Sequence, residues 1–366
     1  MILKQLRLHN YRNYDDLRVS FQNGIHILSG KNAQGKTNVL ESILYISTTR
    51  SHRSNHDEDL IKEGQDAFFI KALISKENKQ VDLQITVNDK GKNLFAYQNP
   101  VNKVSDFIGE FNAVMFCPDD MTLFNATPRV RRRFVDMELS KVSKKYVSTL
   151  FVAQKLLKER NAYLKQERVK KEYLDVITSQ LIDAQVIVMK QRYFFLKQLL
   201  DKCQIFYKTL SQDETNITFT YDSCVEFHDD ETILKQLLSE KYDKNLQRDM
   251  LFKQTTIGIH KEDFIFKMND KEVATYASQG QKRSILLALK IGMVHMIYDI
   301  IHEYPVLLLD DVFSELDIYR RKELLHSLPS SVQIFITTTD VKEFESIEVN
   351  RPVYIWNIQQ GKIDKL

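Results

Sequence analysis

The sequence predicts an α/β protein whose chain is interrupted by a mainly helical lobe. Short apolar runs typical of buried strands alternate with helical patterns at both ends of the chain. The 129 residues between Pro128 and Gly258 contain neither glycine nor proline, which favours long helices because turns commonly use those residues. Within that stretch apolar residues recur at steps of three and four, as in Leu174, Ile177 and Leu181.

These patterns divide the chain into three segments. We expect residues 1–119 and 248–366 to form one α/β domain together, and residues 120–247 to form the helical lobe. The first segment contains a strand–loop–helix unit at 25–47. The last contains two buried strands, "VLLLDD" and "VQIFITTT", with the helical pattern "IYRRKELLHSL" between them. Strands that alternate with helices in this way indicate a mostly parallel sheet.

The composition is that of an ordinary soluble protein, with 43% hydrophobic and 28% charged residues in 366. No apolar run approaches the roughly 18 residues of a membrane span, and the N-terminus lacks the apolar core of a signal peptide. We therefore expect a cytoplasmic protein that does not associate with a membrane. Three widely spaced cysteines, Cys117, Cys203 and Cys224, suit neither a disulfide framework nor a zinc site.

The positive charge is concentrated in one segment. Residues 129–171 contain fourteen Lys or Arg and four Asp or Glu, an excess of +10, although the whole chain carries only +3. Such an excess predicts a polyanionic partner, and DNA phosphates are the natural one. Lys141, Lys144 and Lys145 are our candidate DNA contacts. A solvated helix face with no partner is the alternative.

The arginines at 131–133 have a second possible role. They follow the "CPDD" loop, and they could pair inside the fold with Asp119, Asp120 or Asp136. The sequence does not decide between these pairs and a DNA surface. No zinc finger or other base-reading motif occurs, so we expect recognition of the DNA backbone without sequence preference.

A phosphate-binding loop follows the predicted strand at 25–28. The segment 30–37 fits the pattern G-x-x-x-x-G-K-[ST], in which glycines let successive backbone N–H groups face one anion at a helix start. The lysine reaches the β- and γ-phosphates of a nucleotide and the threonine hydroxyl binds Mg²⁺. The expected ATP-binding residues are Gly30, Lys31, Asn32, Ala33, Gln34, Gly35, Lys36 and Thr37.

Two carboxylates end the buried strand "VLLLDD". Parallel α/β sheets bind ligands at the carboxyl ends of their strands, where Asp310 and Asp311 are expected to lie. We expect Asp310 to hold Mg²⁺ together with Thr37, and Asp311 to orient or deprotonate the attacking water. Lys36 and Asp311 are therefore the candidate catalytic residues. No guanine-recognising N-K-x-D follows, which argues against a GTPase.

The segment "SQGQ" at 278–281 starts a predicted helix. Ser278 and Gln281 have capping-box spacing, so by themselves they indicate only a helix N-terminus. The order of the motifs, however, is that of ABC-type ATPases: the phosphate-binding loop, then S-x-G-Q, then the carboxylate strand, then "SELD". In those proteins the signature residues face the γ-phosphate held by a second subunit. That resemblance implies that Ser278, Gly280 and Gln281 act in trans in an ATP-dependent homodimer.

The chain resembles the RecF family of bacterial recombination mediators, which are relatives of the SMC proteins. The resemblance covers nearly the whole length. It depends on the segments "LRLHNYRNY", "GKNAQGKTNVLESI", "SHRS", "MFCPDDMTLFNATPRVRRRFVD", "GIHKEDF", "SQGQKRS" and "LLLDDVFSELD". It predicts an ABC-type ATPase head, a mixed sheet with helices, with the helical lobe inserted. Ala33 stands where many members have glycine, and the proline expected after Gly258 is missing.

The resemblance also implies a function. It implies ATP-dependent binding to single-stranded and duplex DNA at gaps and junctions in recombinational repair and replication restart. The partners it implies are RecR and RecO, and through them RecA. ATP hydrolysis would be weak and would serve as a switch. Arg12 in "NYRNY" would contact the nucleotide, and Thr337–Thr339 stand where transporters keep a switch histidine.

Two other protein classes remain open. A transporter's ATP-binding subunit would show a switch histidine and would lack so basic a helical insertion. An ATPase–nuclease would need a further acidic domain after Asp317, and about 50 residues follow that position.

Overall fold

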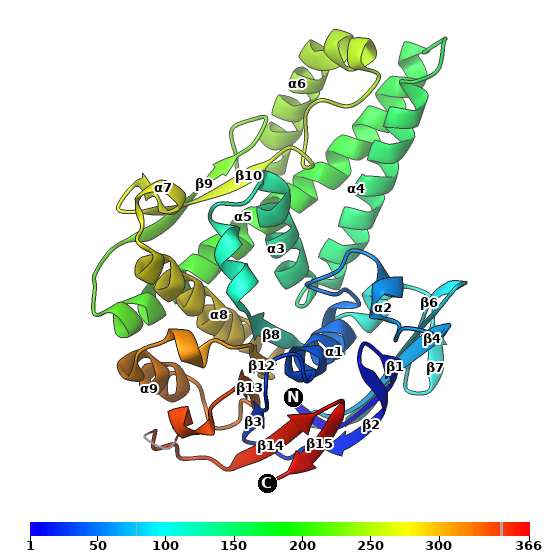
Figure 1. The fold of residues 1–366 in the computed structure, drawn as a ribbon. Helices are drawn as coiled ribbons and strands as arrows, with labels where there is room; N and C mark the ends of the chain where they lie inside the picture. The colour runs from blue at the N-terminus through cyan, green and yellow to red at the C-terminus, as the bar shows by residue number, and fades with distance from the viewer. Residues whose placement is uncertain (78, 345–346) are drawn as a thin grey trace. The chain divides into compact units, whose positions relative to one another are not determined.

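The computed structural model describes residues 1–77, 79–344 and 347–366 (Figure 1). The chain forms two compact units. The first contains Met1–Met121, Lys202–Glu214 and Arg283–Leu366, and the second contains Thr122–Asp201 and Thr215–Lys282. The first unit is thus built from both ends of the chain.

An antiparallel sheet occupies the N-terminal part of the first unit. Its six strands have the order β2-β1-β4-β5-β6-β7. Buried and half-exposed residues alternate along β4 and β5, as expected for a sheet with one face in the core. The strands are β1 (Ile2–Tyr11), β2 (Tyr14–Ser20), β4 (Ala67–Ser75), β5 (Gln80–Asn88), β6 (Gly91–Ala96) and β7 (Asn99–Val101).

A second six-stranded sheet carries the strands that the sequence predicted as buried. Its order is β15-β14-β3-β13-β12-β8, and all neighbours are parallel except the β14–β15 pair. The expected mostly parallel sheet is therefore confirmed. The sequence analysis did not separate it from the antiparallel sheet. The strands are β3 (Ile25–Ser29), β8 (Ala113–Phe116), β12 (Val306–Leu309), β13 (Ile334–Thr338), β14 (Val353–Gln359) and β15 (Lys362–Lys365).

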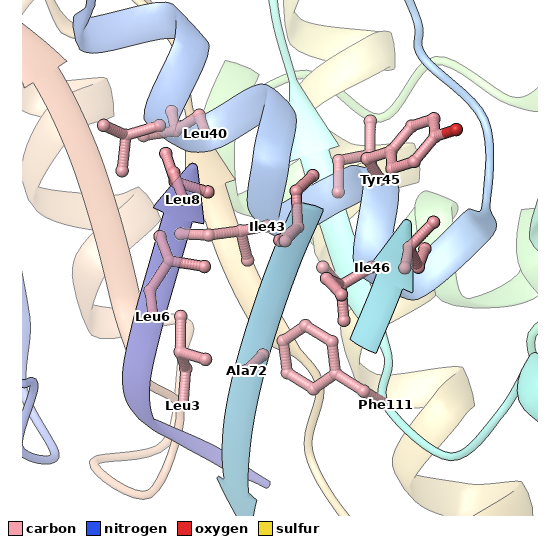
Figure 2. Close-up of a cluster of buried hydrophobic side chains, with 14 of the residues drawn as sticks. Leu3, Leu6, Leu8, Leu40, Ile43, Tyr45, Ile46, Ala72 and Phe111 are labelled. Atoms are coloured by element: carbon pink, nitrogen blue, oxygen red, sulfur yellow. The ribbon is translucent and has the colours of Figure 1, made fainter. Parts of the chain in front are cut away.

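Helix α1 (Lys36–Thr48) lies against both sheets. It contacts β4 and β5 of the antiparallel sheet and β8 and β13 of the parallel one. Eleven of its thirteen residues are buried, so it is a core helix on every side. Figure 2 shows Ile43 and Ile46 of this helix beside Leu6 of β1 and Ala72 of β4.

Several shorter helices and one long helix complete the first unit. Helix α8 (Gln279–Ile301) alone among the described helices is long and apolar enough to cross a membrane, but 72% of its most apolar window is buried in the protein. That burial is typical of a core helix. The others are η1 (Asp57–Leu60), α2 (Val104–Phe107), η2 (Pro118–Leu123), η3 (Phe313–Glu315), α9 (Ile318–His326) and η4 (Val341–Phe344).

The second unit is mainly helical but contains a small sheet. Its strand order is β11-β10-β9, and β9 lies inside the stretch predicted to form long helices. The lack of glycine and proline therefore did not exclude a strand. The elements are α3 (Pro128–Ser140), α4 (Lys144–Tyr163), α5 (Lys171–Ser211), β9 (Ile217–Asp222), α6 (Glu231–Phe252), β10 (Asp263–Met268), β11 (Lys271–Glu272) and α7 (Val273–Tyr276).

The boundary expected at residue 247 differs from the division in the structure. Strand β10 pairs with β9 in antiparallel register from Asp263↔Asp222 to Met268↔Ile217. Those backbone hydrogen bonds hold β10 in the second unit, which therefore extends to Lys282. The end of α5, residues 202–214, belongs to the first unit instead.

A buried ion pair fixes the ends of two helices in the second unit. Arg160 of α4 donates to Asp249 of α6 at 2.7 Å, and both side chains are at most 1% exposed. Asp249 also accepts hydrogen bonds from the backbone and hydroxyl of Thr256. The guanidinium lies over the ring of Tyr242. All the charge in this cluster is therefore paired within the protein.

Replacing Asp249 by alanine should destabilise the second unit strongly. The change leaves the Arg160 guanidinium buried without a counter-charge, which costs about 3–5 kcal/mol. The measurement is the denaturant midpoint of unfolding followed by circular dichroism. Asp243→Ala, on the same helix but exposed, is the matched control and should change the free energy by under about 0.5 kcal/mol. Equal midpoints for the two variants would contradict the prediction.

Candidate nucleotide-binding site

Two glycines shape the loop between β3 and α1. Gly30 has φ of +155° and Gly35 has φ of +111°, backbone conformations that side chains disfavour. A Cβ on Gly30 would lie 2.3 Å from the carbonyl oxygen of Ile358, and one on Gly35 would lie 2.6 Å from Nδ2 of Asn13. Both positions therefore require glycine for conformation and for space.

The turn between β1 and β2 supports this loop from the side. Nδ2 of Asn13 donates to the carbonyl of Gln34 at 3.0 Å, and its Oδ1 accepts from Asn38 at 2.8 Å. The hydroxyl of Tyr14 donates to the carbonyl of Gly35 at 3.1 Å. The sequence analysis did not assign Asn13 or Tyr14. Their only signal was their place in the "NYRNY" segment.

Ala33 adopts a left-handed backbone, with φ of +63°. Glycine is free of strain in this region, whereas alanine costs about 1 kcal/mol there. The position where the resemblance predicts glycine is thus one where glycine would fit more easily. The loop keeps its form with alanine at a modest energetic cost.

Lys36 lies at the start of α1 with its ammonium against the loop. Its Nζ donates to the carbonyls of Gly30 and Lys31 at 2.5 and 3.0 Å. Burial lowers the pKa of Lys36 below its ordinary value, and the carboxylates of Asp311 and Asp310 oppose that shift only in part. An anion at this loop would therefore find a partly desolvated cation and the N-terminus of a buried helix.

The structure brings the two predicted magnesium ligands together. The hydroxyl of Thr37 donates to Oδ1 of Asp310 at 3.0 Å, although the two residues are 273 positions apart. Thr337 donates to the same oxygen at 2.7 Å. Burial raises the pKa of Asp310, and the two hydroxyls oppose that shift only in part. A buried carboxylate whose donors are neutral hydroxyls fits a divalent cation, which would favour its ionised form.

Asp311 follows in a left-handed conformation, with φ of +53°. Its amide donates to Oγ1 of Thr337 at 2.8 Å, and Ser314 donates to its carbonyl at 2.9 Å. Asp311 is exposed, whereas Asp310 is buried. The two adjacent carboxylates thus have different surroundings, one suited to a cation and one open to water.

The three threonines of the switch position differ from one another. Thr337 uses its hydroxyl between Asp310 and Asp311, as donor to the first and acceptor from the second. Thr338 is buried, and its hydroxyl bonds to the backbone of Asp340. Thr339 is exposed. Of these three residues, Thr339 alone is therefore open to solvent.

Arg12 is held by a buried carboxylate next to the loop. Its Nε and Nη2 donate to both oxygens of Glu41 at 3.0 and 2.9 Å, and its Nη1 donates to the carbonyl of Asp59. Glu41 is fully buried on α1 and also accepts from Ser51 at 2.5 Å. Burial raises the pKa of Glu41, but Arg12 and Ser51 outweigh it and the pKa lies below its usual value. The nucleotide contact of Arg12 stays a prediction.

The signature segment forms the capping box that its spacing predicted. The Ser278 amide donates to Oε1 of Gln281 at 2.9 Å, and the Gln281 amide donates to Oγ of Ser278 at 3.2 Å. Ser278 and Gly280 are exposed. A Cβ on Gly280 would meet only Oγ of Ser278, at 4.0 Å. The second unit's own packing therefore does not require glycine there, and a role in trans stays a prediction.

One predicted DNA contact is wrong. Lys141 is buried and pairs with Glu138 at 2.7 Å, with side-chain exposures of 1% and 6%. A lysine without solvent access cannot contact DNA phosphates from the surface. Lys144 and Lys145 at the start of α4 are exposed, as a DNA contact requires. The expectation was wrong for Lys141 because three-residue spacing on a helix brought it beside an acid.

Other cations of the basic segment are also used inside the second unit. Arg131 binds Asp263 through two hydrogen bonds of 2.6 Å. Asp136 pairs with Arg192 of α5 at 2.8 Å. The suggestion of internal pairs for this cluster was therefore correct for Arg131, but its partner comes from "GIHKEDF". Arg131 and Asp263 are 132 positions apart, so no local pattern in the sequence indicated that they pair.

The family model and the sequence relatives place this chain in the same family. Residues 2–363 match the family described as RecF/RecN/SMC N terminal domain. The chain is 37% identical to the DNA replication and repair protein RecF of Bacillus pumilus, over 99% of this chain and 100% of that one. It is 36% identical to RecF of Bacillus subtilis, over the whole of both chains.

Solved structures agree with the sequence relatives. A structure described as the recombination mediator protein RecF-ATP in the RecFOR pathway superposes with a TM-score of 0.92 at 30% identity, covering 100% of this chain and 97% of that one. An Smc head domain from Pyrococcus furiosus has a TM-score of 0.56 at 14% identity, which indicates a shared fold.

Replacing Arg12 by methionine should lower stability in a pH-dependent way. At neutral pH the change leaves buried Glu41 charged and unpaired, which costs about 3 kcal/mol. The pair lowers the folded-state pKa of Glu41, so its contribution is present above about 4.5 and is lost as the pH falls further. The difference between wild type and variant should therefore shrink on acidification, in urea midpoints measured across that range.

Arg7→Met is the matched control for this test. Arg7 lies on β1, the strand that precedes Arg12, and its partner Asp16 is 41% exposed, so the change should cost under about 1 kcal/mol at any pH. Arg12→Met/Glu41→Leu removes both charges and should recover part of the loss. A constant Arg12→Met deficit across the pH range would contradict the role given to Glu41.

Proposed function

The chain belongs to the RecF family, within the group described as RecF/RecN/SMC N terminal domain, and from this premise we propose that it is an ATP-dependent DNA-binding protein of replication and recombinational repair. One observation supports the nucleotide part above all others. Thr37 of the phosphate-binding loop is hydrogen-bonded to Asp310 of a distant strand, inside a single compact unit. This is the arrangement that a magnesium nucleotide requires.

We infer that ATP and Mg²⁺ are the cofactors of this site. Backbone N–H groups of residues 30–37 would bind the phosphates, with the ammonium of Lys36 as the adjacent cation. Thr37 and Asp310 would hold Mg²⁺, which neutralises phosphate charge when bound. Asp311 is the exposed carboxylate beside them and would take the proton of the attacking water or orient it.

We propose that hydrolysis is slow and serves as a switch. Thr337, in the segment where transporters keep a switch histidine, is buried and engaged with Asp310 and Asp311. A threonine hydroxyl does not titrate near neutral pH, so it cannot exchange protons with the reacting groups as a histidine can. Its use in holding the Asp310 carboxylate and the Asp311 backbone amide supports a site suited to binding more than to rapid turnover.

The active form in this proposal is a homodimer held together by ATP. Ser278 and Gly280 lie exposed and Gln281 half-buried at the start of α8, where backbone N–H groups can meet an anion. Glycine in the first turn of a helix costs about 1 kcal/mol relative to alanine, and nothing within the unit crowds Gly280. A close approach by a nucleotide bound to a second subunit would explain why glycine occupies position 280.

We propose DNA as the macromolecular ligand, at gaps and junctions between single-stranded and duplex regions. The exposed lysines at the start of α4, Lys144 and Lys145, are the contacts retained from the sequence analysis. RecR and RecO are the proposed protein partners, with RecA as the protein that is loaded in consequence. A similar protein is described as a recombination mediator of the RecFOR pathway. The proposed location is the cytoplasm.

Mixed variants test the composite site. Lys36→Ala should lose ATP binding because the charge-assisted contact to phosphate is removed, and Ser278→Arg should bind ATP but fail to dimerise. Each variant alone should lack ATPase activity. Their mixture should regain part of it, because one intact loop and one intact signature then meet in a heterodimer. ATP hydrolysis and sedimentation with and without ATP are the measurements.

Two results would count against this proposal. Unchanged ATP binding by Lys36→Ala would remove the loop from nucleotide recognition. An active Ser278→Arg homodimer that still assembles with ATP would show that the signature only caps its helix. Ser278→Ala should lower stability by about 1 kcal/mol through loss of the cap, and it provides the structural control.

DNA binding should depend steeply on salt through surface lysines. Replacing Lys144 and Lys145 by glutamine should lower the slope of log K against log salt by up to about 2, since each phosphate contact releases about one counterion. Duplexes of different sequence should show similar affinities. Lys141→Gln is the matched control: its buried ammonium should leave the slope unchanged. An unchanged slope in the double variant would place the DNA surface elsewhere.

A further inference from the structure

Three helix ends meet in the second unit around one buried arginine. Arg160, near the end of α4, donates to Thr178 of α5, to Asp249 of α6 and to Thr255 just beyond α6. Its side chain is 1% exposed. The end of α4, the first turns of α5 and the end of α6 are therefore fixed beside one another.

The surface at these helix ends consists of residues 158–173 and 244–254, and we call it the helix-end surface. Aromatic contacts add to its order: the rings of Tyr163 and Tyr173 pack edge to face with centroids 4.7 Å apart. Tyr173 also donates to Glu159. The surface is thus a defined structure built from three helices.

Large apolar side chains stand exposed on this surface. Leu251 is 78% exposed, Phe252 54% and Met250 45%, at the last turn of α6, and Tyr173 is 46% exposed. Single exposed apolar residues are common, but three consecutive ones at the end of one helix are unusual and point to an interaction surface. The helix ends at Lys253, whose backbone is left-handed with φ of +52°. The apolar turn is therefore part of a capped helix.

The same surface carries a surplus of positive charge. Its two segments contain nine Lys or Arg and four Asp or Glu, a net of +5. Arg160 and Asp249 cancel each other in the interior, so the surplus belongs to the outside. The guanidinium of Arg248 lies 5.8 Å from the centre of the Phe252 ring. The other cations are Lys158, Lys165, Arg168, Lys170, Lys171, Lys244 and Lys253, all of them exposed.

We propose that the helix-end surface binds unpaired DNA, with bases packing on Phe252 and Leu251 and phosphates on the surrounding cations. Exposed aromatic residues among cations are the combination by which proteins hold single strands without sequence preference. Duplex phosphates would satisfy the cations but leave the apolar turn in water, because duplex bases are stacked inside. This inference depends on the DNA-binding function proposed above and assigns the single strand to a specific surface.

The test compares oligothymidylate with an abasic strand of the same length, which has the phosphates but no bases. Binding of the full-length protein to each labelled strand is measured by fluorescence anisotropy. Wild type should bind oligothymidylate about tenfold more tightly, which corresponds to one stacked base. Leu251→Ser/Phe252→Ser should lose that preference while keeping its affinity for the abasic strand. Phe252→Trp should retain the preference, since an aromatic face remains.

Phe151→Ser is the matched control, because Phe151 of α4 is 66% exposed and lies outside the helix-end surface. It should keep the full preference for bases. A Leu251→Ser/Phe252→Ser variant that still prefers oligothymidylate would overturn the proposal and leave a protein partner as the occupant of the apolar turn. Equal wild-type affinity for the two strands would also overturn it, while ATP-dependent duplex binding would still support the proposed function. A wild-type protein that binds no DNA would contradict both.

Discussion

Burial of α1 between two sheets is the constraint on which the nucleotide site depends. A helix buried on nearly every side cannot shift or rotate without disturbing both sheets, because protein interiors are closely packed. Lys36 and Thr37 are its first residues, so their positions are fixed by the core of the first unit. The preceding loop must then turn sharply from β3 into the helix, which accounts for the two positive-φ glycines.

The burial of α1 also explains why the polar residues beside the loop are hydrogen-bonded to one another and to loop carbonyls. Glu41 lies on a helix that has no solvent face at that position, so its charge needs Arg12 and the Ser51 hydroxyl. Asn13 and Tyr14 occupy the turn that carries Arg12 and bond to the loop carbonyls. The antiparallel sheet thus supports the phosphate-binding loop through residues at the junction of β1 and β2.

The second unit uses its charge differently. Arg131, Arg160 and Arg192 each pair with carboxylates from distant parts of the chain, and these pairs join helices to the small sheet and to one another. Arginine suits this role because its planar group bonds to both oxygens of a carboxylate. The basic segment therefore contains internal pairs and an exposed set, which lies on α3, on α4 and at the helix ends.

The sequence by itself determined the phosphate-binding loop, the carboxylate strand, the capping box at Ser278 and the mostly parallel sheet. The first three are local patterns, in which the spacing of a few neighbouring residues specifies the conformation, and the sheet follows from the alternation of strand and helix patterns along the chain. Only the tertiary structure decided which cations face solvent. Lys141 is buried beside Glu138, with which it pairs, and Arg131 pairs with Asp263, 132 positions away. It also decided that β9 pairs with β10, and that Thr337 connects Asp310 to Asp311. Such contacts join residues far apart in the chain, and their free energy depends on burial and geometry that no local pattern contains.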